Sequence, residues 1–407
     1  MSTFGTPSHL QHFEPTRAAA LERVARLSPS RYARTRNHLD GAVSGLSPYI
    51  THGLISVPEV LRLLHAKQSL NFSDKLVAEF AWREFFTHVW SHLGDKVLDD
   101  QRAPVWSGAY ARQLPPDIRE GRTGVKAIDS AVRVLYATGY LHNHARMWLA
   151  SYVVHLRKVH WRVGADWLLA HLLDGDLASN HLSWQWVGGT FSSKPYLFNA
   201  ENVDKYAPAV AADAWSSAGS AIDTSYEALD DIARSSKRLE PVRAAPHSVA
   251  EPAVSGAPAH TQAFDAAALD GRSVELVHPW ALNDRAASAE DARFESGFRL
   301  GVIHLPHHQR FAWNERRWNF VMTRMREVCD SLFIGDLATL KPALASAASV
   351  RTSATYNSAY AQVLASLAQV DAAPRLFPNP NMLMTSFTRF YERVQKDHKS
   401  FESLLIV

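Results

Sequence analysis

The chain has 407 residues, of which 46% are apolar, 10% aromatic and 20% charged. This composition is typical of a folded protein of two or three domains and excludes a wholly disordered or fibrous chain. The single cysteine, Cys329, excludes an internal disulfide framework, and the absence of a signal-peptide pattern or a bilayer-length apolar run predicts a cytoplasmic protein without a membrane partner.

Charge is unevenly distributed along the chain. Residues 1–207 carry 23 Lys and Arg against 18 Asp and Glu, a net charge of +5, whereas the remainder carries 20 against 22, a net charge of −2. The N-terminal half is therefore the better candidate for binding a polyanion, although a solvated basic surface explains the same asymmetry.

The first half of the chain shows helical periodicity. Between residues 56 and 186, apolar side chains recur every three or four positions. The clearest examples are Leu76, Phe80, Phe85 and Val89, followed by Ile128, Val132 and Leu135. We predict an all-helical domain over residues 1–207.

The composition changes twice in the second half. Residues 208–271 are rich in Ala, Ser and Pro, which prevents a long helix and predicts a linker with one short helix near 226–235. Beyond this stretch, short apolar or β-branched runs alternate with helical ones, which predicts a parallel α/β sheet over residues 272–398. The expected strands are 274–277, 300–303 and 332–334, and the expected helices are 315–328 and 337–345.

The stretch from Asp174 to Trp186 combines two carboxylates, an amide and two indoles within about three helical turns. Carboxylates accept hydrogen bonds from ring N–H groups or pair with arginine, an amide faces a ring nitrogen that gains and loses a proton, and indoles relay electrons. This mixture suits a redox cofactor. The alternative is a loop with capping aspartates beside a buried tryptophan.

Four motifs occur in one order. They are Trp82 to Phe85, Gly121 to Gly124 with Asp129, His142 to Met147, and Asp174 to Trp186. In order and spacing these segments resemble the FAD-binding domain of the photolyase/cryptochrome family, over roughly residues 31–208. The resemblance implies an all-helical FAD-binding domain.

The resemblance also implies the residues that bind FAD. They are Tyr32, Ser44, Leu46, Ser47, Arg83, Asn143, Arg146, Asp174, Asp176 and Asn180. Among them, Arg146 and Asp174 are expected to form a buried ion pair, and Asp176 to accept a hydrogen bond from the flavin or a sugar hydroxyl. Asn180 stands where family members place the residue facing flavin N5, and a neutral amide there tolerates anionic reduced flavin.

The family's electron relay is matched in part. The resemblance assigns Trp184 and Trp161 to two of its tryptophans. The position expected for the third falls near residues 108–110, so Trp106 or Tyr110 is the candidate for the outer step.

For substrate, the resemblance implies DNA with a flipped pyrimidine dimer. The matching positions are Glu79, Trp82, Asn143, Met147, Trp186 and Arg36. Glu79 is expected to donate a proton, the indoles to stack on the dimer, and Arg36 to contact phosphate. Glu79, Asn180, Trp184 and Trp161 are the residues expected to take part in catalysis.

The implied activity is light-dependent repair of cyclobutane pyrimidine dimers by electron transfer from reduced FAD. A cryptochrome-like photoreceptor without repair, or a flavoenzyme with another substrate, remains the alternative. Val43 and His144 replace a threonine and an arginine common in the family, and the loop 188–199 is short, which weakens the DNA prediction more than the FAD prediction.

The C-terminal half resembles the α/β antenna domain that ordinarily precedes the FAD domain in this family. The similar segments are 276–284, Arg317 with Trp318, Gly335 with Asp336, and 387–391. We therefore expect a circularly permuted member, in which an antenna-like domain follows the FAD domain, with a second chromophore left open. His304, His307 and His308 lack a carboxylate or thiolate at metal-ligand spacing, so we predict no metal site.

Overall fold

The computed structural model describes residues 4–241, 248–259, 264–284, 297–398 and 400–405. These residues form two compact units, and each unit is made of three separate stretches of the chain. The helical unit comprises the described residues of Met1–His12, Ser28–Val43 and Asp95–Ala253, and the sheet-containing unit those of Phe13–Leu27, Ser44–Gly94 and Val254–Val407. The predicted ranges 1–207, 208–271 and 272–398 divide the chain differently and stay a prediction about domains.

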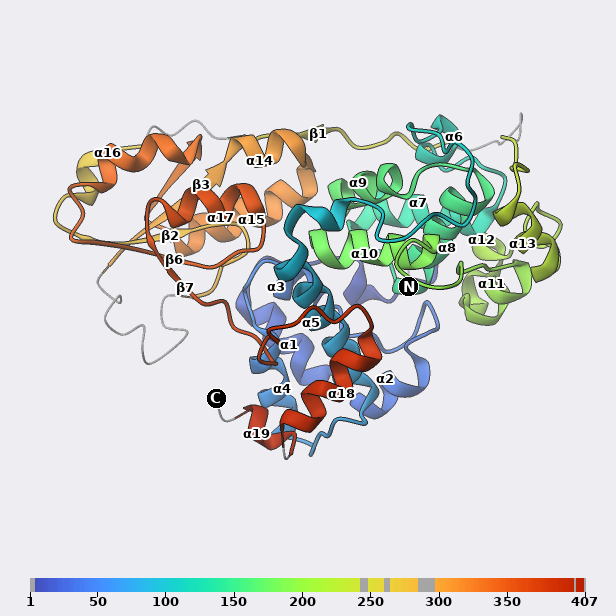
Figure 1. Ribbon diagram of the computed structural model, residues 1–407, viewed down its shortest axis with the longest axis horizontal. Helices are drawn as coiled ribbons and strands as arrows, with labels where there is room; N and C mark the ends of the chain where they lie inside the picture. Colours follow the sequence, from blue (N-terminus) through green and yellow to red (C-terminus); the bar gives the residue numbers. More distant parts are fainter. Residues whose placement is uncertain (1–3, 242–247, 260–263, 285–296, 399, 406–407) are drawn as a thin grey trace. The chain divides into compact units, whose positions relative to one another are not determined.

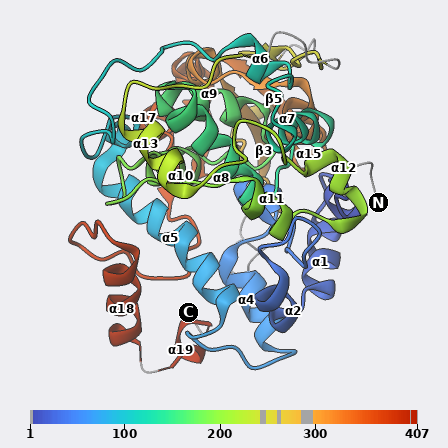
Figure 2. The same ribbon diagram turned by 90° about the vertical axis from the view of Figure 1, so that its right-hand side faces the viewer.

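The helical unit is built on helices α7 to α10, which contact one another in sequence order (Figure 2). Its helices are α2 (Pro29–Thr35), α6 (Pro116–Arg119), α7 (Lys126–Thr138), α8 (Asn143–Ser151), α9 (Trp161–His171), α10 (Leu177–Gly188), α11 (Ala200–Tyr206), α12 (Ala212–Trp215) and α13 (Tyr226–Arg234). Short 3-10 turns are η1 (Ser8–Leu10), most of η2 (Gly94–Leu98) and η4 (Ala209–Ala211), and a π-helical turn, η3 (Tyr152–Leu156), follows α8.

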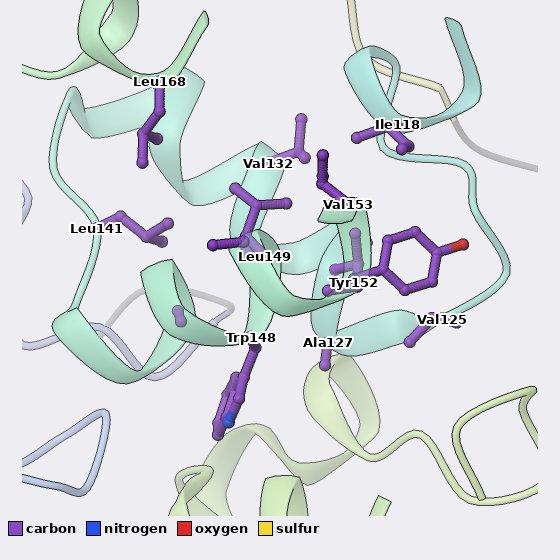
Figure 3. Packing of buried hydrophobic residues seen from close by; sticks show 14 of the residues in the cluster. Ile118, Val125, Ala127, Val132, Leu141, Trp148, Leu149, Tyr152, Val153 and Leu168 are labelled. Atoms are coloured by element: carbon purple, nitrogen blue, oxygen red, sulfur yellow. The ribbon is translucent and has the colours of Figure 1, made fainter. Parts of the chain in front are cut away.

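The core of this unit confirms the predicted helical stripe. Ile128, Val132 and Leu135 on α7 are fully buried and belong to one hydrophobic cluster with Trp148 and Leu149 of α8. Figure 3 shows Val132, Trp148 and Leu149 of this cluster. Burial of each such side chain contributes roughly 1.5–3 kcal/mol relative to exposure. The helices that hold the site residues are therefore fixed by their apolar faces.

The Ala/Pro/Ser-rich stretch contributes to the same core. The short helix expected near 226–235 is present as α13. Trp215, Ile222 and Leu229 are buried in the hydrophobic cluster of the helical unit. The first part of the stretch is thus packed, because it carries isolated large apolar side chains among its small residues.

The sheet-containing unit has a parallel sheet of five strands in its described residues, in the order β5-β3-β2-β6-β7. Figure 1 labels four of them, β3, β2, β6 and β7. Its strands are β2 (Ser273–Val277), β3 (Phe298–His304), β5 (Ser331–Gly335), β6 (Ser349–Ser353) and β7 (Gln369–Asp371), and β1 (Val254–Ser255) pairs antiparallel with β4 (Trp313–Asn314). Numbered along the chain, the order is 3-2-1-4-5, that of a doubly wound fold. The three predicted strands are confirmed, whereas β6 and β7 were not predicted.

Helices of this unit come from both ends of the chain. They are α1 (Arg17–Arg26), α3 (Ser47–Thr51), α4 (Val57–His65), α5 (Lys75–Leu93), α14 (Leu305–Arg310), α15 (Glu315–Val328), α16 (Lys341–Leu344), α17 (Ser358–Ala365), α18 (Phe387–Asp397) and α19 (Glu402–Leu405), with 3-10 turns η5 (Ala266–Leu269) and η7 (Leu337–Leu340). Helix α15 has the predicted bounds, and α18 packs against α5. No helix in the described part of the chain combines the length and apolar character needed to cross a bilayer.

Candidate functional site

Helix α10 begins at the carboxylate-rich stretch. The Asp176 side chain accepts a hydrogen bond from the Ser179 backbone N–H at 2.8 Å, so this aspartate is the N-cap of the helix. Asp174 lies just before it and is buried. The alternative prediction, a capping aspartate, is therefore correct for Asp176. Binding of FAD by the same carboxylate stays a prediction.

Arg146 and Asp174 form the expected ion pair. The Arg146 Nη2 atom lies 3.0 and 2.8 Å from the two oxygens of Asp174, whose side chain is only 3% exposed. Arg146 also donates through Nε to the Leu141 carbonyl at 2.7 Å. The pair joins α8 to the segment that enters α10.

One turn into α10, Asn180 presents an unused acceptor. Its Nδ2 donates to the Ala165 carbonyl at 2.8 Å, which fixes the amide, while Oδ1 accepts no hydrogen bond from the described residues. The Ser179 hydroxyl beside it is buried and likewise has no partner in the described part of the chain. A buried hydroxyl without a partner, such as that of Ser179, calls for a hydrogen bond from a ligand or water.

The relay candidates Trp161 and Trp184 are both 2% exposed and belong to one buried cluster. Helices α9 and α10 approach closely because residue 164 is glycine. A Cβ there would lie 2.3 Å from two ring carbons of Trp184. The indole of Trp184 therefore occupies the space that a side chain at residue 164 of α9 would need.

The two outer relay candidates lie together at the end of a ring series. The ring centroids of Trp106 and Tyr110 are 5.2 Å apart, Tyr110 is 6.4 Å from His160, and His160 is 5.7 Å from Trp161. The Trp106 indole also covers Gly108: a Cβ on this glycine would lie 2.1 Å from the ring. The Trp106 ring thus lies against residue 108, at one end of the range 108–110 near which the third tryptophan is expected.

Helix α8 presents its substrate candidates on one turn. Asn143 is exposed, and its Nδ2 lies 3.5 Å from the Met147 sulfur. Burial, as the largest cause, lowers the pKa of the preceding His142 to about 3 and that of His144 to about 4. Both imidazoles are therefore neutral at pH 7, so His144 carries no positive charge for a phosphate contact.

Three other predicted site residues, Tyr32, Arg36 and Trp186, lie in the helical unit. Tyr32 and Arg36 stand one helical turn apart, and the Arg36 backbone N–H donates to the Tyr32 carbonyl at 2.9 Å. Trp186 is half-buried at the end of α10, with its ring 6.2 Å from that of Tyr196.

The remaining predicted residues lie in the sheet-containing unit. The turn before α3 has Gly45 at a positive φ of 59°, and the Ser44 hydroxyl accepts from the Leu46 N–H at 3.3 Å. Leu46 is the N-cap of α3, and Ser47 is its first residue. The predicted turn is confirmed as a local structure, while its role in binding phosphate stays a prediction.

Helix α5 places Glu79, Trp82 and Arg83 on one face, because they are three and four positions apart. Glu79 is exposed, and Arg83 donates to the Thr51 hydroxyl at 3.1 Å. Trp82 is stacked on Phe387 of α18, with ring centroids 4.0 Å apart and an interplanar angle of 7°. One face of the indole is therefore covered by this unit's own chain.

Sequence reasoning gave no role at these sites to several residues that shape them. Gly164 and Phe387 act through packing on Trp184 and Trp82, and Asp100 accepts a hydrogen bond from the Trp161 indole at 2.5 Å. Each contact joins positions far apart in the chain. A local motif gives no signal for them.

His304, at the end of β3, and His308, on α14, form a packed polar cluster with Tyr360. His308 Nε2 lies 2.9 Å from the Tyr360 hydroxyl, which also accepts from the His304 N–H at 2.8 Å. Burial lowers the pKa of His308 well below its ordinary value and raises that of Tyr360. Within the described residues, no group of three or more His, Cys, Asp or Glu side chains is arranged to hold a metal ion.

Comparisons with known proteins place these features in a class. Residues 76–249 match the model of the FAD-binding domain of DNA photolyase. The chain is 31% identical over 207 residues to a deoxyribodipyrimidine photo-lyase of Synechococcus sp., covering 46% of this chain and 42% of the relative. It is 38% identical over 173 residues to a protein of the same name from Thermus thermophilus, covering 41% of this chain and 40% of the relative.

A solved cryptochrome of Synechocystis sp. PCC6803 is 25% identical, with a TM-score of 0.43, over 48% of this chain and 44% of that one. The chain thus spans about two-fifths of the length of the curated relatives it matches.

The matched domain and the acceptor-rich start of α10 define an FAD-binding flavoprotein. Residues 76–249 are similar to the FAD-binding domain of DNA photolyase, and the similarity to the named photo-lyases is confined to less than half of this chain. The residues at the start of α10 fit this cofactor. The unused oxygen of Asn180 and the unpartnered hydroxyl of Ser179 can both accept hydrogen bonds from N–H or O–H groups of a flavin.

Proposed function

We propose that this chain is a blue-light-dependent photolyase that repairs cyclobutane pyrimidine dimers in DNA. The observation that carries the proposal is helix α10, where Asp176, Asn180 with its unused oxygen, and the buried Trp184 follow one another within about two and a half turns. The relatives named deoxyribodipyrimidine photo-lyase support it. Because only part of their length is matched, the repair activity and the DNA substrate are proposals for this chain.

FAD supplies, when bound, the absorption of blue light and the transfer of one electron. In this proposal Asn180 Oδ1 accepts from the flavin N5–H, and Asp176 accepts from a ring N–H or a sugar hydroxyl. Arg146 and Asp174 brace the entry to α10 through their ion pair. The remaining cofactor contacts are assigned to Tyr32, Ser44, Leu46, Ser47, Arg83 and Asn143.

The substrate residues are those predicted from the family pattern. Glu79 donates a proton to the dimer during cleavage, and Asn143 hydrogen-bonds to it. Trp82 and Trp186 stack on the dimer, Met147 contacts its saturated edge, and Arg36 contacts a phosphate. Trp161 and Trp184 relay electrons when the flavin is oxidised.

We also propose that the sheet is an antenna-type domain placed after the FAD-binding domain in a permuted chain. The parallel strand order 3-2-1-4-5 supports this idea, because it is a doubly wound arrangement. Two of the segments similar to the antenna domain include the ends of strands in this sheet, residues 276–277 of β2 and Gly335 of β5.

A cryptochrome-like photoreceptor is the second candidate, and one contact favours it. The Phe387 ring covers a face of Trp82 at 4.0 Å, which leaves that indole less surface for stacking on a dimer. In this case FAD and the tryptophans change redox state, and no lesion is repaired.

A repair assay separates the two candidates. The reduced holoprotein is illuminated with oligothymidylate that contains dimers, and recovery of thymine absorbance is followed. We expect recovery by the wild type and roughly hundredfold slower recovery by Glu79→Gln, because a positioned general acid is lost. Glu392→Gln, at an exposed position on α18, is the matched control.

Flavin content is measured in all three proteins. Unchanged flavin in the slow Glu79→Gln variant supports the assignment of this residue to the substrate. Loss of flavin in parallel with repair would show that Glu79 is misplaced. A wild type with photoreducible FAD but no repair would reject the photolyase proposal in favour of the receptor.

A further inference from the structure

The indole of Trp161 has a carboxylate partner. Its Nε1–H donates to Asp100 Oδ1 at 2.5 Å. Trp161 itself is buried, whereas the Asp100 side chain is 36% exposed. The hydrogen bond therefore joins a buried, oxidisable ring to a base that exchanges protons with solvent.

The segment that carries Asp100 is held on both sides by α10. Gln185 is fully buried; its Nε2 donates to the Val97 carbonyl at 2.9 Å, and its Oε1 accepts from the Gln101 N–H at 3.1 Å. From α9, Arg162 donates to the Leu98 carbonyl at 3.1 Å. These three bonds position the carboxylate, so it needs no rearrangement to meet the indole.

We propose that Asp100 is the proton acceptor for oxidised Trp161 and that the electron missing after photoreduction of the flavin is finally missing from Trp161, which remains as a neutral radical. This inference rests on the proposed relay through Trp184 and Trp161. Trp184 gives one electron to the photoexcited oxidised flavin and then takes one from Trp161. Trp161 next gives its Nε1 proton to the Asp100 carboxylate, which passes it to solvent.

The charges along the ring series favour a stop at Trp161. Farther out, the Lys158 ammonium lies 5.2 Å from the centroid of the Trp106 ring, and a cation there opposes a second positive charge on the indole. The Tyr110 hydroxyl accepts from the Trp106 backbone N–H, and in the described residues no carboxylate takes a hydrogen bond from either ring. If Trp106 or Tyr110 gave an electron to Trp161, its own ring would lack the carboxylate acceptor that Trp161 has.

No other titratable group in the described residues accepts a hydrogen bond from the Trp161 indole. His160 Nε2 lies 3.7 Å from Asp100 Oδ1, and burial lowers the pKa of this histidine, so it is neutral at pH 7. Arg162 is paired with Asp166 at 2.9 Å. Asp166 in turn accepts from His181, whose ring is 6.0 Å from that of Trp161.

Transient absorption spectroscopy of the holoprotein with oxidised FAD tests the proposal, because cationic and neutral tryptophan radicals have different spectra. In the wild type we expect a neutral radical that disappears in Trp161→Phe. Asp100→Asn keeps an oxygen for the hydrogen bond but removes the base, and we expect deprotonation to slow by roughly a hundredfold. Asp99→Asn, at the neighbouring exposed position, is the matched control and should resemble the wild type.

Equal deprotonation rates in Asp100→Asn and Asp99→Asn would overturn the inference while leaving the relay intact. Absence of any tryptophan radical in the wild type would overturn both the relay and the inference. Repair by the pre-reduced protein tests the photolyase proposal separately, because that reaction does not need the relay.

The hydrogen bond between Trp161 and Asp100 can also be tested in the apoprotein, where a variant that fails to bind FAD can still be measured. In the ¹⁵N-indole NMR spectrum of the apoprotein, the Trp161 signal, assigned with Trp161→Phe, should shift as Asp100 is protonated. The shift should persist in Asp99→Asn and vanish in Asp100→Asn. A Trp161 signal insensitive to pH in the wild type would contradict the hydrogen bond.

Discussion

Gly164 is a single residue on which the position of Trp184 depends. A Cβ at this site would lie 2.3 Å from two carbons of the indole, a distance that real contacts do not reach. We expect Gly164→Ala to displace Trp184 and to destabilise the helical unit by about 1–3 kcal/mol, as overpacking of a core does. Urea denaturation measures the stability, and transient absorption measures the electron transfer through the moved indole.

Gly188 provides the matched control on α10. A Cβ there would meet Val154 at 3.6 Å and Trp161 at 3.8 Å, which is ordinary van der Waals contact. Gly188→Ala should therefore leave the electron-transfer rate near that of the wild type. Equal effects of the two substitutions would show that α9 and α10 adjust to a side chain at residue 164.

The Arg146–Asp174 pair is another residue-scale feature with a measurable consequence. Asp174 is almost fully buried, so its removal leaves Arg146, 24% exposed, without its anion. We expect Asp174→Ala to cost about 3 kcal/mol or more of unfolding free energy and to lower FAD content. Asp230→Ala removes a carboxylate that is 41% exposed and pairs with Arg234 one turn along α13, and it serves as the comparison; a similar loss in both would contradict a special role for the buried pair.

At the scale of elements, a buried ion pair fixes the segment before α18 to α5. Arg375 Nε lies 2.9 Å from Glu84 Oε2, and its Nη2 donates to the Glu84 carbonyl at 3.1 Å. The Glu84 side chain is 8% exposed. We expect Arg375→Met to destabilise the sheet-containing unit by about 3–5 kcal/mol, because it leaves the carboxylate buried and unpaired.

Arg393→Met is the control for that change. Arg393 pairs with Asp397 within α18, and both side chains are about half exposed, so the loss should stay below about 1 kcal/mol. Thermal unfolding followed by tryptophan fluorescence compares the two variants. A small effect of Arg375→Met would mean that the segment docks mainly through its apolar side chains.

Sequence patterns predicted those elements whose apolar spacing is local. The buried stripe on α7 and the strands β2, β3 and β5 are examples, because each carries a clear apolar run or period. The strand β6 reads Ser-Val-Arg-Thr-Ser and β7 has three residues, so neither shows such a run. The Arg146–Asp174 pair was predicted through the family pattern, whereas the contact of Asp100 with Trp161 spans 61 positions and follows no pattern.

At the scale of the molecule, the two compact units are not contiguous in sequence. The stretches Phe13–Leu27 and Ser44–Gly94 belong with the C-terminal half, although their helical composition matches that of the chain around them. Composition marks changes in secondary structure, and it does not reveal which helices share a core. For this reason the predicted domain ranges and the observed units differ.

Neutral buried histidines give the molecule a common response to acid. Burial, the largest cause, lowers the pKa of His155 and of His278 to about 4, against 6.5 for a solvated imidazole. The unfolded chain takes up these protons as pH falls through 6.5, whereas the folded chain resists until about pH 4. The stabilisation is therefore fully present above pH 6.5 and is lost between pH 6.5 and 4.

His155 isolates one such contribution. Its Nε2 lies 2.9 Å from the Val187 carbonyl, and its Nδ1 is buried without a partner in the described residues, so a second proton would be unbonded. We expect His155→Gln to reduce the loss of unfolding free energy between pH 6.5 and 5 by roughly 2 kcal/mol. Urea denaturation at several pH values measures the loss, with His12→Gln, at an exposed position, as the control. Parallel stability curves for all three proteins would mean that His155 titrates like a solvated imidazole and that acid acts on the fold through other groups.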